Sequence, residues 1–297
     1  MTLITAKGLC KDYGSTRALN NIDLILSGDG NIALVGPNGA GKTTLFSILC
    51  GYLTPSSGSI EILGHKPGSA ALHGKLSALP QDAQLDPGFA IGTQLKHLCA
   101  LQGFRGKAAL EETKRVLALV NLSDSIKRRP NELSHGMHKR LTIAQALIGA
   151  PELILLDEPT AGLDPVNARE IRQLISDLSE QCQFVISSHN LEELEKLCSQ
   201  VLYIEQGRLT QQLTSDDREH NGFLGLTLTS PLEEGHGLDQ LYGVLGLSVK
   251  SKLQLQFRYD IKNHPDFDLS LLHALKAKDI GYRQLSLGRS LEERLFD

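Results

Sequence analysis

Nine consecutive residues near the start of the chain have the types and spacing of a phosphate-binding loop. The segment from Gly36 to Thr44 fits the pattern G-x-x-x-x-G-K-[ST], with the final Gly-Lys-Thr at residues 41–43. Gly39 and Gly41 lack a Cβ atom, so backbone N–H groups there can converge on phosphate oxygens. The residues expected to bind the nucleotide are Gly36, Pro37, Asn38, Gly39, Ala40, Gly41, Lys42, Thr43 and Thr44.

Two side chains at the end of this loop carry the chemistry of nucleotide binding. Lys42 is expected to reach the β- and γ-phosphates, and the Thr43 hydroxyl can ligate Mg²⁺. A short apolar strand predicted at residues 32–35 leads into the loop, and the helix predicted after it points its positive end at the same anion. A glycine turn that arose by chance is the alternative, and the acidic residues downstream argue against it.

An acidic pair follows a second apolar segment. Residues 153–156 are Leu or Ile and predict a buried strand, and Asp157 and Glu158 come directly after it. Asp157, at the sheet edge beside the loop, can hold Mg²⁺ through water. Glu158 can polarise the attacking water as a general base. A solvated acid pair after a core strand is the alternative, but together with the phosphate loop the pair predicts an ATPase.

Strands and helices are predicted to alternate along the first two thirds of the chain. This alternation is typical of an α/β fold with a parallel sheet, here interrupted by an amphipathic helical segment. Further strands are predicted at residues 60–63, 184–187 and 201–204, and helices after Pro165 and at residues 191–197.

The expected architecture is a P-loop NTPase core with a helical subdomain insert, followed by a small α+β domain. The first domain covers residues 1–213, with the insert at about residues 86–150. A polar linker covers residues 214–221 and the small domain residues 222–297. The small domain is expected to be ferredoxin-like. Its strands are predicted at residues 224–229, 253–259 and 282–287, and its helices at residues 238–244 and 269–275.

The composition of the 297 residues argues against several classes of protein. The hydrophobic fraction of 41% and charged fraction of 22% are ordinary for a soluble protein. A net charge of −4 argues against a basic nucleic-acid binder. The five cysteines include no Cys-x-x-Cys pair, which argues against a zinc ribbon or a disulfide framework. Apolar runs are far shorter than the ~20 residues of a membrane span, so any membrane role requires a partner that supplies the spans.

On these motifs, about residues 3–210 resemble the ATP-binding subunits of ABC transporters. Residues 133–137, Leu-Ser-His-Gly-Met, are similar to the family signature, whose common form is LSGGQ. Gln81 matches the glutamine of the Q-loop, and residues 161–164, Ala-Gly-Leu-Asp, match the D-loop. His189 matches the switch histidine.

The resemblance implies a role for each matching residue, with ATP and Mg²⁺ as the cofactors. Ser134 and Gly136 would contact the γ-phosphate held by the opposite subunit, so hydrolysis would need a head-to-tail homodimer or heterodimer. Gln81 would ligate Mg²⁺, take part in catalysis and couple to the insert. His189 would hold the γ-phosphate and align the water. Tyr13 stands where the family stacks an aromatic ring on adenine.

The D-loop and the signature add two details. Asp164 would lie across the dimer interface. In the signature, His135 replaces a glycine and Met137 replaces the usual glutamine. Gly136, which lets the backbone approach the phosphate, is retained, so we expect two subunits still to sandwich ATP.

The resemblance also implies a membrane partner. In the family the insert receives the coupling helices of a separate integral membrane permease, and docking is expected near residues 85–93. Phe89 and Ile91 are apolar residues that can dock there or belong to the core. A small domain after the core and a tail such as residues 290–296, Ser-Leu-Glu-Glu-Arg-Leu-Phe, are typical of exporters. We therefore expect an exporter ATPase, peripheral to the cytoplasmic face of the inner membrane.

A different function is a soluble ABC-type ATPase that acts on ribosomes or nucleic acid without a permease. Such proteins usually carry two ATPase cores or a long coiled-coil insertion together with basic extensions. This sequence has one core, no heptad insertion and no basic run, so no nucleic-acid partner is expected. The transport path of an exporter lies in its permease, so the cargo is not encoded in this chain.

Overall fold

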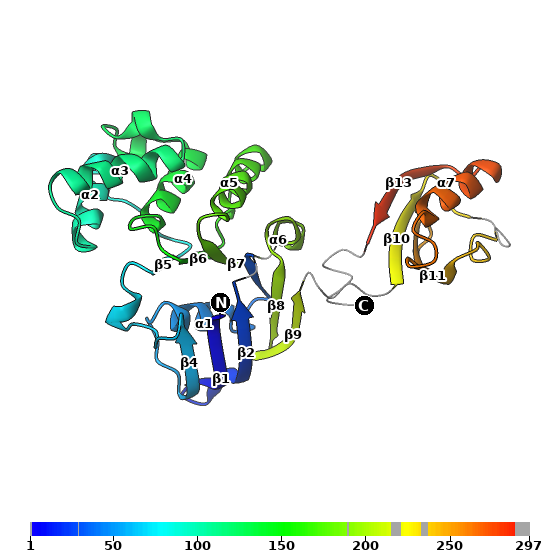
Figure 1. The fold of residues 1–297 in the computed structure, drawn as a ribbon, viewed down its shortest axis with the longest axis horizontal. Coiled ribbons are helices and arrows are strands. Elements are labelled where there is room, and N and C mark those ends of the chain that lie inside the picture. Colours follow the sequence, from blue (N-terminus) through cyan, green and yellow to red (C-terminus); the bar gives the residue numbers. More distant parts are fainter. Residues whose placement is uncertain (1, 29, 189, 215–220, 233–236, 289–297) are drawn as a thin grey trace. The chain divides into compact units, whose positions relative to one another are not determined.

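The chain forms two units, each with its own core. In the described part of the chain, the first unit contains two sheets and the second contains one. The first is Met1–Thr214 and the second is Ser215–Asp297, and both are coloured along the sequence in Figure 1. The computed structural model describes residues 2–28, 30–188, 190–214, 221–232 and 237–288.

The larger sheet of the first unit contains six strands: β3 (Ile32–Val35), β5 (Leu76–Leu79), β6 (Leu153–Asp157), β7 (Gln183–Ser187), β8 (Gln200–Glu205) and β9 (Arg208–Thr214). Their order is β5-β6-β7-β3-β8-β9. Neighbours from β5 to β8 run parallel, and β9 is antiparallel to β8. The apolar residues of β3 and β6 are all buried, which explains why these strands read as continuous apolar runs.

The carboxyl ends of the parallel strands meet at one edge of this sheet. Gly36 follows β3 and Gln81 follows β5, while Asp157 and Ser187 are the last residues of β6 and β7. In open α/β sheets this edge is where ligands bind. Four residues that are far apart in sequence therefore reach the same edge because of the strand order.

The first unit also contains a smaller antiparallel sheet, which packs against the phosphate loop. It contains β1 (Thr2–Tyr13), β2 (Thr16–Ser27) and β4 (Ser57–Ile62), in the order β2-β1-β4. Of the three strands of this sheet, the sequence predicted only part of β4. Strand β1 was missed because register shifts after Ala6 and after Leu9 break its alternation of apolar residues. Buried residues of this sheet share one core with β3 and with helix α1 (Lys42–Leu49).

Three α-helices lie between β5 and β6 and form the helical insert: α2 (Ile91–Leu101), α3 (Lys107–Leu119) and α4 (His135–Ala146). Two further helices flank β7, and short 3₁₀ helices complete the connections. These are α5 (Pro165–Leu178), α6 (Leu191–Leu197), η1 (Ala70–Leu72), η2 (Ser123–Ser125) and η3 (Pro130–Glu132).

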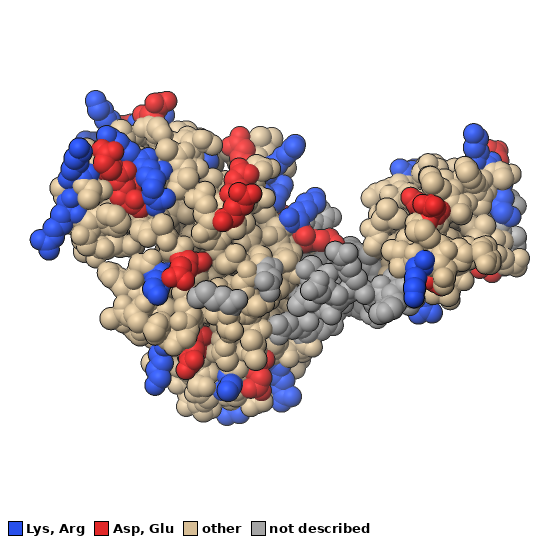
Figure 2. Space-filling view, viewed as in Figure 1, with Lys and Arg blue, Asp and Glu red and all other residues tan. Residues whose placement is uncertain are grey.

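The insert is electropositive although the whole chain is acidic. Residues 86–150 contain ten Lys or Arg against five Asp or Glu, whereas the whole chain contains 30 against 34. Figure 2 shows basic side chains gathered on the surface that the insert forms. The excess positive charge therefore belongs to the one segment inserted into the core.

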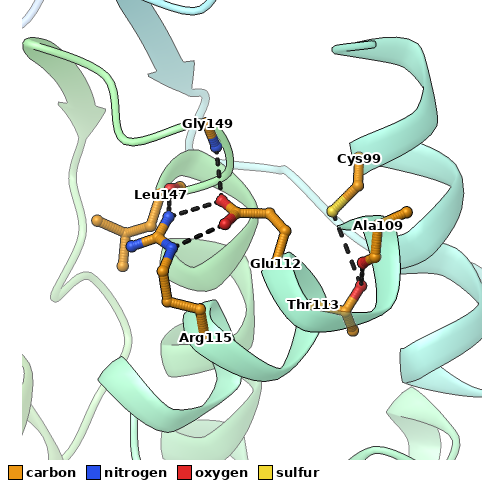
Figure 3. A network of polar contacts seen from close by, with 7 residues as sticks. All are labelled: Cys99, Ala109, Glu112, Thr113, Arg115, Leu147 and Gly149. Atoms are coloured by element: carbon orange, nitrogen blue, oxygen red, sulfur yellow. Dashed lines mark hydrogen bonds and ion pairs between the residues drawn. The ribbon is translucent and has the colours of Figure 1, made fainter. Parts of the chain in front are cut away.

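A nearly buried polar network fastens α3 to the C-terminal end of α4 (Figure 3). The Arg115 guanidinium donates two hydrogen bonds to the Glu112 carboxylate, at 2.8 and 2.6 Å. Glu112 also accepts from the Gly149 N–H, and Arg115 donates to the Leu147 carbonyl, both at 2.8 Å. The Glu112 side chain is only 10% exposed, and the hydrogen bonds from Arg115 lower the pKa of its carboxyl. The network joins the insert to the turn that leads into β6.

The second unit is an antiparallel sheet packed on one helix. Its elements are β10 (Asn221–Leu228), β11 (Val244–Ser251), β12 (Gln254–Asp260), β13 (Tyr282–Leu287) and α7 (Phe267–Ala277). The order β11-β12-β10-β13 places β12 between β10 and β11, as in the split βαβ arrangement of ferredoxin-like domains. Alternate residues of β10, namely Leu224, Leu226 and Leu228, are buried in one core with Phe267 of α7.

The prediction of a helix at residues 238–244 is wrong. The described residues there form turns that lead into β11, a strand that the sequence did not predict. Gly243 has φ +94°, and a Cβ atom at this position would lie 2.7 Å from the His264 ring. The chain therefore turns back sharply at Gly243, and a helix cannot continue through it.

Two predicted segments fall wholly or mostly outside the described residues. Thr214 ends β9 and Asn221 begins β10, and the linker residues 215–220 between them are not described. The tail at residues 290–296 is not described either. Within the described ranges, no helix combines the length and apolar character needed to cross a membrane.

Glu112→Gln should lower the free energy of unfolding of the first unit by about 2 kcal/mol near pH 7, because hydrogen bonds to a charged, nearly buried group are lost. The folded pKa of Glu112 lies below its ordinary value of 4.5. The stabilisation is therefore present above that value and is lost as the pH falls through the folded pKa. Urea unfolding at several pH values, followed by circular dichroism, measures the difference between parent and variant.

Glu111→Gln is the matched control on the same helix. Glu111 pairs with Lys114 at the surface, where both side chains are more than half exposed, so the change should cost less than about 0.5 kcal/mol. An effect of Glu112→Gln that equals that of the control, or that stays constant down to pH 3, would contradict the role given to the network.

Candidate nucleotide-binding site

The phosphate loop joins β3 to α1 and is wedged between the two sheets of the first unit. Gly36 has φ +154°, and a Cβ atom on it would lie 2.0 Å from the Ile204 carbonyl oxygen of β8. Gly41 has φ +108°, and a Cβ atom on it would lie 2.6 Å from the Ala18 carbonyl oxygen of β2. Only glycine fits at these two positions, so the glycines fix the loop against both sheets.

The middle of the loop is open. Gly39 has φ +79°. Apart from the two residues next to it in sequence, no described residue has an atom within 4 Å of where its Cβ atom would be. Pro37 and Asn38 beside it are exposed. Since α1 begins at Lys42, its N-terminal N–H groups and its positive end lie next to this opening. The loop therefore has the open backbone cradle that a phosphate chain needs.

Lys42 reaches back across its own loop. Its ammonium donates to the carbonyl oxygens of Gly36 at 2.6 Å and Pro37 at 3.1 Å. Burial lowers the pKa of Lys42, and the negative charges of Glu158 and Asp157 oppose that shift. The ammonium thus lies within the electrostatic reach of both predicted acids, where phosphate oxygens can replace the carbonyl oxygens as acceptors.

The acidic pair is held by a serine of the neighbouring strand. The Ser187 hydroxyl donates a short hydrogen bond to Asp157. The same hydroxyl accepts from the Glu158 N–H at 3.2 Å, and the Ser187 carbonyl accepts from that N–H at 3.1 Å. Glu158 adopts φ +48°, which is uncommon for a residue with a Cβ atom. Ser187, which is 1% exposed, therefore sets the turn that separates the two carboxylates.

Ser134 and Gly136 head helix α4. Ser134 is the N-cap, and its hydroxyl accepts from the Met137 N–H at 3.3 Å. Gly136 packs so closely on α5 that a Cβ atom there would lie 1.8 Å from the Asn167 side-chain oxygen. The Asn167 amide in turn donates to the Asp164 carboxylate. Within one chain, the signature and the D-loop are therefore joined through Asn167.

Gln81 and the signature helix line opposite sides of one hollow of about 490 Å³, whose lining includes His135, Lys139 and Gly162. His135, which replaces the usual glycine, lies against the D-loop, since a Cβ atom on Gly162 would be 3.5 Å from its ring. Burial lowers the pKa of Lys139, and the negative charges of Asp82, Glu158 and Asp157 oppose that shift. Lys139 of α4 and Asp82 thus line the same hollow.

Tyr13 presents an open aromatic surface at the end of β1. Its side chain is 47% exposed, and the Lys11 ammonium lies 5.4 Å from the ring centroid. Arg17 and Asp12 form an ion pair across the turn to β2, the strand that contacts Gly41. The β1–β2 hairpin therefore connects the tyrosine to the phosphate loop.

His189, the predicted switch histidine, lies outside the described residues. The residues on either side of it are described. The Asn190 N–H donates to the Ser188 hydroxyl at 3.1 Å, and the Asn190 side chain caps α6 by accepting from the Glu193 N–H at 3.3 Å. The start of α6 is thereby fixed directly after position 189.

Sequence reasoning missed two residues at this site, Ser187 and Asn167. The only signal for Ser187 was its place two residues before His189 at the end of a predicted strand. Asn167 gave a weaker signal, three residues into the helix after Asp164. In the docking segment predicted at residues 85–93, Phe89 is 57% exposed, whereas Ile91 is fully buried and belongs to the core.

A parallel sheet with a phosphate loop after β3 and an acid pair at the end of β6 defines the P-loop NTPase class. Residues 19–161 match the family described as ABC transporter. The chain is 31% identical over 207 residues to the "Uncharacterized ABC transporter ATP-binding protein YhaQ" of Bacillus subtilis, covering 69% of each chain. It is 36% identical over 202 residues to the "Nod factor export ATP-binding protein I" of Burkholderia lata, covering 67% of this chain and 66% of the relative.

A solved structure supports the fold. The dimeric, post-hydrolysis form of an ATP-binding cassette bound to ADP and Pi superposes with a TM-score of 0.63 at 22% identity, covering 71% of this chain and 98% of that one. With the family match and the relatives, the chain belongs to the ABC transporter family of ATP-binding proteins. It is an ATP-binding ATPase of that family.

Gly136→Ala tests why this position is glycine. The added methyl group would collide with Asn167 and displace the start of α4, so the ATPase rate should fall about tenfold or more, because a small misplacement of a binding group is costly in rate. If the collision is the cause, Gly136→Ala combined with Asn167→Ala should recover at least half of the rate that Asn167→Ala shows alone. Steady-state ATPase assays of the three variants compare these rates. A double variant as slow as Gly136→Ala would instead mean that the methyl group blocks the phosphate itself.

Proposed function

We propose that this chain is the ATP-hydrolysing subunit of a membrane exporter, acting in a head-to-tail dimer with a separate permease. The observation that carries the proposal is the assembly of Lys42, Asp157 and Glu158 at one sheet edge, with Ser187 fixing the acids. Such a group combines phosphate binding with a base for water attack.

The residues present fit ATP and Mg²⁺. Thr43, Gln81 and Asp157 offer hydroxyl, amide and carboxylate oxygens, which are the ligands Mg²⁺ prefers. Bound Mg²⁺ would neutralise charge on the phosphates. Lys42 would bind the β- and γ-phosphates, and Glu158 would take the proton of the attacking water. His189 would align that water, and Tyr13 would stack on adenine.

The position of the signature supports the proposed dimer. Ser134 and His135 are exposed at the N-terminus of α4, where backbone N–H groups and the helix dipole favour an anion. The Ser134 hydroxyl accepts from the Met137 N–H of its own helix. The exposure of Ser134 and His135 leaves this N-terminus accessible to the γ-phosphate of a second subunit. A homodimer and a heterodimer both satisfy this geometry.

Two features support a permease partner and export. The insert offers an electropositive surface and the exposed Phe89, eight residues after Gln81 in the sequence, which suits docking of a segment with acidic and apolar side chains. A relative carries the name "Nod factor export ATP-binding protein I". Binding to a permease would make this chain peripheral to the cytoplasmic face of the inner membrane.

Glu158→Gln should keep ATP binding but reduce hydrolysis at least about a hundredfold, because the amide cannot accept the proton of the water. The ATP-bound dimer should accumulate as a result. Size-exclusion chromatography with ATP and Mg²⁺ detects the dimer, and phosphate release measures turnover. Hydrolysis at the parent rate would contradict the role of Glu158 as the base.

Lys42→Ala should remove most nucleotide binding, since the loop then loses its only ammonium and the phosphates lose that counter-charge. Equilibrium binding of a fluorescent ATP analogue, with unlabelled ATP as competitor, measures the loss. Parent-like affinity together with parent-like turnover would contradict the assignment of the phosphate loop itself.

A further inference from the structure

One carboxylate on α6, that of Glu193, holds two separate segments of the first unit. One oxygen accepts from the Thr160 hydroxyl at 2.6 Å. The other oxygen forms a short ion pair with Arg172 of α5. Helices α5 and α6 lie side by side (Figure 1). Glu193 therefore joins α6 to α5 and to the loop between β6 and α5.

The burial of this group makes the contacts strong. The side chains of Glu193 and Arg172 are only 13% and 23% exposed. Charge-assisted hydrogen bonds in such surroundings are roughly twice as strong as neutral ones. Losing a donor would leave a nearly buried carboxylate with one partner fewer, so the arrangement of the three groups is well defined.

Thr160 lies between the proposed base and the D-loop. The Ala161 N–H donates to the Glu158 carbonyl at 3.1 Å, and the Leu163 N–H donates to the Thr160 carbonyl at 3.2 Å. These two turns lead from Glu158 to Asp164. Any displacement of Thr160 must therefore move the backbone on both of its sides.

Glu193 also contacts Asn190, the residue that follows the predicted switch histidine. The Glu193 N–H donates a hydrogen bond to the Asn190 side-chain oxygen. A hollow of about 390 Å³ is lined by Gly162 and Leu163 of the D-loop and by Ser188 and Asn190. Thr160, Arg172 and Glu193 belong to the same lining. Their polar contacts bridge a gap that apolar packing does not fill.

We propose that Thr160, Arg172 and Glu193 form a positioning network that holds the D-loop at a fixed distance from Ser188 and Asn190. The inference rests on the proposed function, in which Glu158 and His189 act on the attacking water and Asp164 reaches the second subunit. None of the three residues belongs to the phosphate loop, and none of them lines the hollow beside Gln81 and the signature. The network sets the rate of hydrolysis once ATP is bound and leaves the affinity for ATP unchanged.

The test uses variants of the full chain that remove one contact at a time. Thr160→Val keeps the shape and removes the hydroxyl, and Arg172→Gln removes the charge. Each should lower kcat about tenfold, while the KM and the binding constant for an ATP analogue change less than about twofold. Arg172→Lys should restore part of kcat, because an ammonium can still pair with Glu193.

The double variant supplies a further readout. Thr160 and Arg172 act through the same carboxylate, so their combined effect on kcat should fall clearly short of the product of the two single effects. Arg169→Gln, an exposed arginine on the same helix, is the matched control and should leave kcat unchanged. Thermal unfolding of each variant shows whether a loss of activity comes from a loss of folded protein.

The outcomes separate this inference from the proposed function. Parent-like kcat in Thr160→Val and Arg172→Gln, with Glu158→Gln inactive, would overturn the network and leave the function standing. A parallel loss of kcat, affinity and thermal stability would also overturn it, since the contacts would then be merely structural. An active Glu158→Gln would count against the proposed function, whatever the network variants show.

Discussion

The phosphate loop has no space for a side chain at the points where it touches the two sheets, and the rest of the site depends on this constraint. Gly36 is pressed on β8 and Gly41 on β2. Gly207, in the turn after β8, completes the contact, since its N–H donates to the Ala40 carbonyl at 2.9 Å and its carbonyl accepts from the Asn20 N–H at 2.7 Å. The cradle therefore exists only when both sheets are in place, so the fold and the binding site form together.

The charges at the sheet edge are arranged by the same packing. The parallel pairing of β6 with β7 sets Asp157 beside Ser187, and the hydroxyl of Ser187 then orders both acids. Lys42 loses solvation through burial and is compensated by those acids. An ammonium group and carboxylates that lie near one another favour each other's charged forms. These charges complement a ligand that carries both negative phosphate groups and a positive metal ion.

Three sets of polar contacts connect the elements around this edge to the insert, to the signature and to α6. Glu112 and Arg115 fasten the insert to the turn before β6, and Asn167 joins the D-loop to the signature. Glu193 joins Thr160, the residue before the D-loop, to α6. Each link uses one nearly buried or closely packed side chain between two elements.

The amino-acid sequence was enough to predict the phosphate loop, the acid pair and the inner strands of the larger sheet. Their chemistry needs fixed spacing along the chain, and strands buried on both faces read as apolar runs. It failed at β1, where register shifts break the alternation, and at residues 238–244, where close packing on His264 forces a turn. The folded structure was needed to reveal that Ser187 holds Asp157, 30 residues away, and that Glu193 holds Thr160, 33 residues away. Such pairs depend on strand register and helix packing, and serine, threonine and glutamate are too common for their types alone to reveal the partner.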